Sequence, residues 1–112
     1  MSDSAADAHR RLPAIALADG EMTTVDVGGE PLVICRLAER YHAIRDRCTH
    51  ANQKLSEGRM RGHTIYCPLH GARFDLRNGR CLTGPATEDV PAYDVHEDAQ
   101  GLFLGRRIGL SQ

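Results

Sequence analysis

The 112-residue sequence contains no tryptophan, and its aromatic side chains amount to three tyrosines and two phenylalanines. So few rings argue against a stacking surface for single-stranded nucleic acid. Fourteen basic and fifteen acidic residues leave a net charge of -1, so there is no positive excess to attract nucleic acid or an anionic membrane. No apolar run approaches the roughly 18 residues that a transmembrane helix needs. We therefore expect neither nucleic acid nor a membrane as a partner.

Sustained helical periodicity is also missing, whereas eleven glycines and five prolines separate short runs of β-prone residues. The runs that predict strands are Met22–Val27, Leu32–Leu37, Tyr41–Ile44, Val90–His96 and Leu102–Arg106. Gly28-Gly29 predicts a hairpin turn between the first two of them. This pattern predicts an all-β fold, a small antiparallel sandwich or barrel.

The length fits a single domain with one modest core. Residues 1–11 are polar and predict a disordered tail, which leaves residues 12–112 for the domain. The segment from about 45 to 86 follows the strand rhythm least well and reads as an inserted, loop-rich subdomain. Long irregular segments inside compact domains usually serve a function.

That segment contains the residues that suggest a metal site. Cys48 and His50 lie one residue apart, and Cys67 and His70 follow after an interval of sixteen residues. Thiolates and imidazoles at such spacing suit zinc or an iron–sulfur centre, and suit magnesium or calcium poorly. Four cysteines in 112 residues are too few for a disulfide-built fold. Pro68 stiffens the second loop, while Gly71 permits a turn that directs backbone amides inward.

The pattern C-x-H-x16-C-x-x-H, with Thr49, Pro68 and Gly71 in place, resembles the Rieske [2Fe–2S] family, and the similarity continues to Pro85 and Ala86. The resemblance implies a small antiparallel Rieske β-domain with one [2Fe–2S] cluster per chain. It implies that Cys48 and Cys67 bind one iron and that His50 and His70 bind the other. It also implies that Gly84 and Pro85 belong to a loop that covers the cluster, and that Pro68 and Gly71 support the ligand loops.

Two differences from the respiratory branch of that family concern the reduction potential. The respiratory proteins carry an extra cysteine in each ligand loop, and the two form a disulfide that the present sequence cannot make. They also carry a serine and a tyrosine whose hydroxyls donate toward sulfur, where this sequence has Ala72 and Phe74. Because fewer donors stabilise the reduced cluster, we expect a potential in the lower part of the Rieske range.

The resemblance implies a Rieske ferredoxin that carries single electrons from an NAD(P)H-dependent flavin reductase to a terminal ring-hydroxylating oxygenase in bacteria. Both partners would dock transiently near His50 and His70. A catalytic oxygenase would need a second iron site with two histidines and a carboxylate, and only His96 follows His70. We therefore expect an electron carrier and not an enzyme. The absence of a convincing export signal suggests the cytoplasm, and we expect a monomer.

Two other functions remain open from the sequence. One is the Rieske-like small subunit of an assimilatory nitrite reductase, and the other is a structural zinc module. Outside the motif, we interpret Cys35 and Cys81 as buried thiols and His42 and His63 as structural residues within strands. Five arginines, which form either a solvated surface or a docking surface for an acidic partner, are Arg59, Arg61, Arg73, Arg77 and Arg80.

Overall fold

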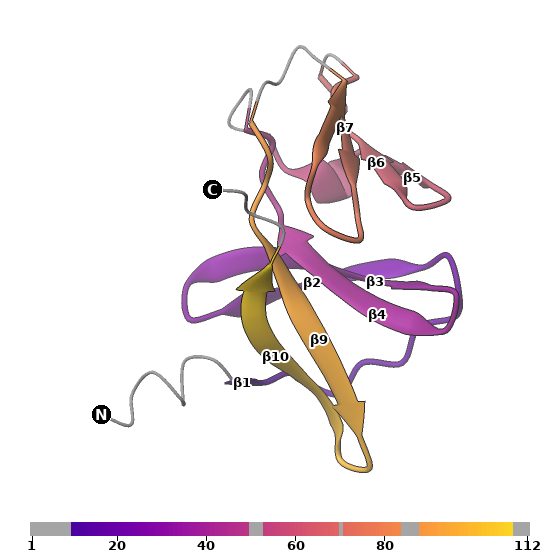
Figure 1. The fold of residues 1–112 in the computed structure, drawn as a ribbon, viewed down its shortest axis with the longest axis vertical. Coiled ribbons are helices and arrows are strands. Elements are labelled where there is room, and N and C mark those ends of the chain that lie inside the picture. Colours follow the sequence, from indigo (N-terminus) through magenta and orange to yellow (C-terminus); the bar gives the residue numbers. More distant parts are fainter. Residues whose placement is uncertain (1–9, 50–52, 70, 84–87, 109–112) are drawn as a thin grey trace.

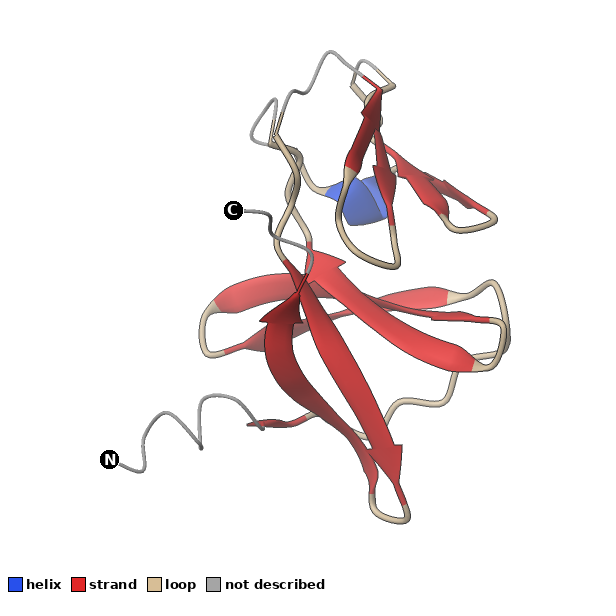
Figure 2. Ribbon diagram, in the orientation of Figure 1, coloured by secondary structure: helices blue, strands red, loops and turns tan. Residues whose placement is uncertain are grey.

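The chain folds into two antiparallel β-sheets, one of six strands and one of four, in the part of the chain that the structure describes (Figures 1 and 2). The structure is a computed structural model, and it describes residues 10–49, 53–69, 71–83 and 88–108. Its helical content there is one short 3₁₀ helix, η1 (Leu55–Glu57). The all-β prediction is therefore confirmed. No helix among these residues has the length and apolar character needed to cross a membrane.

The six-stranded sheet forms the base of the molecule. Its strands run in the order β1 (Arg10–Arg11), β10 (Gly101–Ile108), β9 (Ala92–Asp98), β4 (Arg40–Arg45), β3 (Glu30–Leu37) and β2 (Met22–Val27). The consecutive pairs β2–β3, β3–β4 and β9–β10 are antiparallel hairpins with short turns. These hairpins are the ones that the alternation of β-prone runs and turn residues predicts.

The boundaries of β9 differ from the sequence prediction. The strand begins at Ala92, although the apolar run begins at Val90. Val90 is fully buried, and its N–H donates to the carbonyl of Gly79 at 2.8 Å. The N–H of Val90 is therefore bonded to a turn of the four-stranded sheet. For this reason Val90 is not part of the hydrogen-bonded ladder that β9 forms with its neighbours.

Arg10 and Arg11, which the sequence assigned to the tail, form strand β1, which pairs with β10 at the edge of the six-stranded sheet. The guanidinium of Arg11 lies 3.2 Å from the carboxylate of Asp98 and 5.0 Å from the ring centre of Phe103. Leu12 is buried directly after the strand. These contacts order the polar end of the segment, and the rest of the predicted tail lies outside the described residues.

The four-stranded sheet is inserted between β4 and β9. It contains β5 (Arg59–Arg61), β6 (Thr64–Tyr66), β7 (Arg73–Asp75) and β8 (Cys81–Thr83), in that order. Figure 1 shows it above the base, attached through the two segments that follow β4 and precede β9. The sequence predicted loops here, but three-residue strands are too short to show a period, and only their pairing makes them recognisable.

Two apolar clusters lie on opposite sides of strand β3. Val33 and Cys35 face the cluster that the base shares with the four-stranded sheet. Leu32 and Ile34 face the other cluster, which lies within the six-stranded sheet and also contains Leu104 of β10. Because side chains alternate along a strand, one continuous apolar run serves both cores.

Candidate metal centre

Cys48 and Cys67 lie in two loops that the backbone closes in the same way. The N–H of Cys48 donates to the carbonyl of Gln53 at 2.8 Å, and the N–H of Cys67 donates to the carbonyl of Ala72 at 2.7 Å. Each bond joins a residue to the one five positions later. The first loop follows β4 and the second follows β6, so the two cysteines are positioned by different strands, one in each sheet. Each loop also contains one histidine of the motif.

Both cysteines are buried in the same apolar cluster. Each is 2% exposed, and the cluster also includes Leu55, Ile65 and Phe74. An apolar surrounding excludes water and disfavours a bare thiolate, whereas a bound metal cation compensates the thiolate charge. Two thiol donors brought into one dry cluster therefore fit a soft metal centre.

The second loop turns at Gly71, whose φ of 78° lies in the left-handed region. The N–H of Gly71 donates to the carbonyl of Cys67 at 3.1 Å, so this amide closes the loop itself. Pro68 and Leu69 at the outer part of the loop are exposed, with Leu69 52% accessible. A side chain at position 71 would be strained in this turn, as the sequence suggested for glycine.

A third segment is fastened to the first loop. The Thr49 hydroxyl donates to the carbonyl of Glu88 at 2.7 Å, and the N–H of Cys81 donates to the carboxylate of Asp89 at 2.8 Å. The residues before and after positions 84–87 are therefore held next to the first ligand loop. The predicted covering residues Gly84 and Pro85 lie outside the described residues.

A buried carboxylate, which the sequence did not single out, supports the first loop. Asp46 is 1% exposed, and it accepts two hydrogen bonds of 2.7 Å from the N–H and the hydroxyl of Ser56. Its own N–H donates to the carbonyl of Pro31. Asp46 thus ties η1 to the base two residues before Cys48. A short acidic residue directly after β4 is the only trace of this role in the sequence.

The two histidines of the motif, His50 and His70, lie outside the described residues. Among the residues that are described, no group of three or more potential ligands comes together. The structure thus brings the two cysteines into one cluster and fixes the ends of the loops that contain the histidines.

The remaining cysteines and histidines are placed elsewhere. Cys35 is fully buried on β3, and burial raises the pKa of its thiol to about 12. Cys81 is half-buried on β8, so its predicted burial is only partial. His42 lies on β4, where burial lowers its pKa. His63 lies in the turn between β5 and β6, so the expected strand position is wrong. There its imidazole contacts Asp75.

Comparison with known protein families decides the class of this centre. The family model of the Rieske [2Fe–2S] domain matches residues 10–94, which include both cysteine loops and most of the base. The chain belongs to the Rieske [2Fe–2S] family. A Rieske domain binds a [2Fe–2S] cluster, in agreement with the buried thiol pair.

Relatives of this Rieske protein are ferredoxins of dioxygenase systems. It is 33% identical, over 82% of its length and 87% of the relative, to the 3-phenylpropionate/cinnamic acid dioxygenase ferredoxin subunit of Shigella boydii serotype 4 (strain Sb227). It superposes with a TM-score of 0.75 and 34% identity on the ferredoxin of carbazole 1,9a-dioxygenase from Nocardioides aromaticivorans IC177, over 80% of this chain and 88% of that one.

A further solved structure is a complex of reduced oxygenase and oxidized ferredoxin in carbazole 1,9a-dioxygenase. The Rieske protein matches a chain of it with a TM-score of 0.74 and 29% identity, over 86% of this chain and 87% of that one. In that system a ferredoxin therefore binds an oxygenase directly.

Proposed function

We propose that this Rieske ferredoxin carries single electrons from an NAD(P)H-dependent flavin reductase to a terminal ring-hydroxylating oxygenase. The observation that supports this most strongly is the pair of equally closed cysteine loops in a chain that matches dioxygenase ferredoxins over most of their length. The carbazole dioxygenase ferredoxin is bound to its oxygenase, which supports the same kind of acceptor here.

The proposed ligands are Cys48 and Cys67 for one iron and His50 and His70 for the other. The bound cluster supplies a site that gains and loses one electron, at a higher potential than all-cysteine clusters because two neutral imidazoles replace two thiolates. The chain contributes two loops closed by backbone hydrogen bonds, an apolar surrounding that excludes water, and the hydroxyl of Thr49, which donates to the carbonyl of Glu88.

The proposed role is that of a carrier without catalysis of its own. Docking takes place near His50 and His70, because electron transfer needs a short path from the ligands to the partner. Pro68 and Leu69 beside this site are exposed and provide an apolar contact for a short-lived complex. The proposed location is the cytoplasm, and the proposed unit is a monomer with one cluster.

The oxygenase system is preferred to the two alternatives. The relatives named above are dioxygenase ferredoxins, which favours an oxygenase over a nitrite reductase as the acceptor. A structural zinc module is disfavoured because the chain matches the Rieske model over both ligand loops.

Spectroscopy of the purified protein tests the cofactor and its ligands. We expect a red-brown protein with visible absorption and an EPR signal after dithionite reduction. His70→Cys should retain a cluster at a lower reduction potential, because a charged thiolate replaces a neutral imidazole. A colourless, EPR-silent protein with stoichiometric zinc would overturn the proposal, and an unchanged potential would remove His70 from the ligand set.

Reconstitution tests the direction of electron flow. The holoprotein should accept electrons from a flavin-dependent NADH reductase and support turnover of a ring-hydroxylating oxygenase such as the 3-phenylpropionate enzyme. Electron delivery to a nitrite reductase large subunit, with none to oxygenases, would contradict the assignment.

A further inference from the structure

Charge is distributed very unevenly along this nearly neutral chain. Five arginines and one aspartate occur between residues 59 and 83, the segment that forms the four-stranded sheet. The rest of the chain has nine basic and fourteen acidic residues. The smaller sheet is therefore strongly positive, while the remainder of the molecule is negative.

The strand registers place the positive charge on one face of the four-stranded sheet. Arg59 pairs with Tyr66, Tyr66 pairs with Arg73, and Arg73 pairs with Thr83. Arg61, two residues beyond Arg59, points to the same face, because side chains alternate along a strand. We call Arg59, Arg61, Tyr66 and Arg73 the arginine face. Ile65 and Phe74, the buried neighbours in the strands, face the core.

The arginines of this face have no acidic partner in the part of the chain that the structure describes. Arg59, Arg61 and Arg73 form no ion pair with any described residue. Arg73 instead donates to the Thr83 hydroxyl at 3.1 Å and lies 5.7 Å from the ring centre of Tyr66. Asp75 lies on the same face by register, but it is buried and is engaged by Arg77 at 2.9 Å.

A pocket of about 530 Å³ opens between these side chains. Arg59, Arg61 and Tyr66 line it, together with Cys67 and the carboxylate of Glu57. That carboxylate already accepts a 2.7 Å hydrogen bond from the Gln53 side chain. Two guanidinium groups and a phenol around one opening provide donors for an incoming carboxylate.

We propose that the arginine face is a docking surface for an acidic segment of a protein redox partner, with one carboxylate of the partner entering the pocket beside Cys67. The role of that partner rests on the proposed electron-transfer function. Nucleic acid fits poorly, because the negative remainder of the molecule repels a long polyanion and the chain has few aromatic side chains. A short acidic segment contacts the positive face alone.

A decaglutamate peptide is a suitable probe that needs no identified partner. The holoprotein should bind it with an affinity that falls as salt is added. The double variant R59E/R61E should weaken binding about tenfold or more, because it reverses the two charges at the pocket. R106E/R107E is the matched control, since it makes the same change of charge on exposed positions of β10.

Two outcomes of the peptide experiment overturn the docking surface. One is equal loss of binding in R59E/R61E and R106E/R107E, which would show a response to net charge alone. The other is tighter binding of a 20-base-pair DNA duplex than of the peptide at the same salt concentration. The visible spectrum verifies that each variant is folded and loaded, and R59Q/R61Q gives the same test with a smaller change of charge.

Stopped-flow electron transfer separates the docking surface from the proposed function. With a functional reductase and oxygenase, R59E/R61E should slow the second-order transfer with at least one of them about tenfold at low salt, and this loss should shrink at high salt. Unchanged rates with both partners would overturn the redox-partner assignment. Absence of any transfer in the unmodified protein, with peptide binding intact, would instead contradict the proposed function and leave the surface in place.

Discussion

Asp46 illustrates how one side chain positions a ligand loop without belonging to it. Its carboxylate satisfies both the N–H and the hydroxyl of Ser56 while almost no surface of Asp46 is exposed. We expect Asp46→Ala to destabilise the protein by about 2–3 kcal/mol, because two charge-assisted hydrogen bonds are lost in a buried place. Thermal unfolding followed by loss of visible absorbance measures this.

Ser56→Ala is the matched control for Asp46→Ala. It removes the hydroxyl but keeps the backbone N–H, so we expect a smaller loss of about 1 kcal/mol. An Asp46→Ala protein that unfolds at the temperature of the unmodified protein would refute the positioning role.

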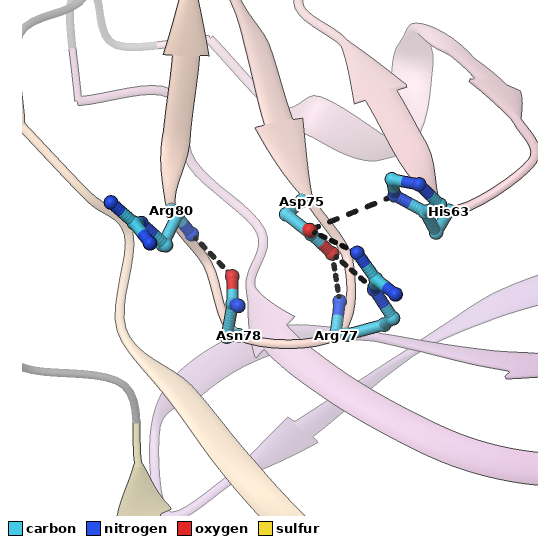
Figure 3. Close-up of polar contacts among 5 residues, drawn as sticks. All are labelled: His63, Asp75, Arg77, Asn78 and Arg80. Atoms are coloured by element: carbon cyan, nitrogen blue, oxygen red, sulfur yellow. Dashed lines mark hydrogen bonds and ion pairs between the residues drawn. The ribbon is translucent and has the colours of Figure 1, made fainter.

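Asp75 makes the lower end of the four-stranded sheet sensitive to acid. Figure 3 shows its carboxylate in contact with both His63 and Arg77, and the guanidinium and N–H of Arg77 donate to it at 2.8–3.0 Å. Burial alone would raise the pKa of Asp75, but these hydrogen bonds and the positive charge of Arg77 outweigh it and hold the pKa below its usual value.

The sign of the pH effect follows from this lowered pKa. The folded state favours ionised Asp75, so its contribution to stability is full above about pH 5 and is lost as the pH falls below about 4. We expect Arg77→Met to lower the urea midpoint at pH 6 and to lower it less at pH 3. Arg80→Met, on the same turn and without an ion pair among the described residues, is the control. An equal effect of Arg77→Met at both pH values would contradict the role of Asp75.

At the scale of elements, the approach of two segments beside Cys67 depends on Gly58. A Cβ atom at this position would lie 1.8 Å from the carbonyl oxygen of Tyr66. Since that neighbour is backbone, it cannot rotate away, and η1 and β5 would have to move from β6. We expect Gly58→Ala to cost about 2–3 kcal/mol and to weaken cluster retention, measured by urea unfolding and by bleaching of the visible bands.

Gly20→Ala is the control for Gly58→Ala, because it strains the backbone without creating a steric clash. Gly20 has a φ of 86°, and nothing lies within 4 Å of the position of its Cβ. We expect a loss of about 1 kcal/mol there, with the cluster retained. Equal costs of Gly20→Ala and Gly58→Ala would show that the contact with Tyr66 is not decisive.

The sequence predicted the hairpins well and the inserted sheet poorly. Met22–Val27 was predicted with its observed ends, because a run rich in threonine and valine precedes a two-glycine turn. Strands β5 to β8 have three residues each, and their apolar positions become recognisable only when Ile65 pairs with Phe74. A single sequence contains no signal for pairing between such short segments.

At the scale of the whole molecule, Cys35 lies in the core that joins the two sheets. Its thiol is fully buried, and the pKa of about 12 leaves almost no thiolate at pH 8. We expect iodoacetamide to modify half-buried Cys81 first and to reach Cys35 only when urea unfolds the protein. Peptide mass spectrometry measures both sites, and equal rates in the absence of urea would contradict this packing.

The sequence predicted the chemistry of the candidate site, but not the hydrogen bonds that position its loops. The spacing of Cys48, His50, Cys67 and His70 predicts the class of metal site. In the structure the two cysteines are buried in the same group of apolar side chains. The ligand role of all four residues stays a prediction. The Asp46–Ser56 bonds and the contact from Thr49 to Glu88 join residues 10 and 39 positions apart, and no local pattern encodes them.

The attachment of the four-stranded sheet has a consequence for how such a protein can be rebuilt. Ala43 and Ile44 of β4 pair with Tyr93 and Ala92 of β9, and the N–H of Arg45 donates to the carbonyl of Pro91. The chain therefore leaves the base and returns to it at the same place. The segment between β4 and β9, which contains the four-stranded sheet and both cysteine loops, therefore has adjacent ends. An insertion of different length could replace it without changing the strand order of the six-stranded sheet.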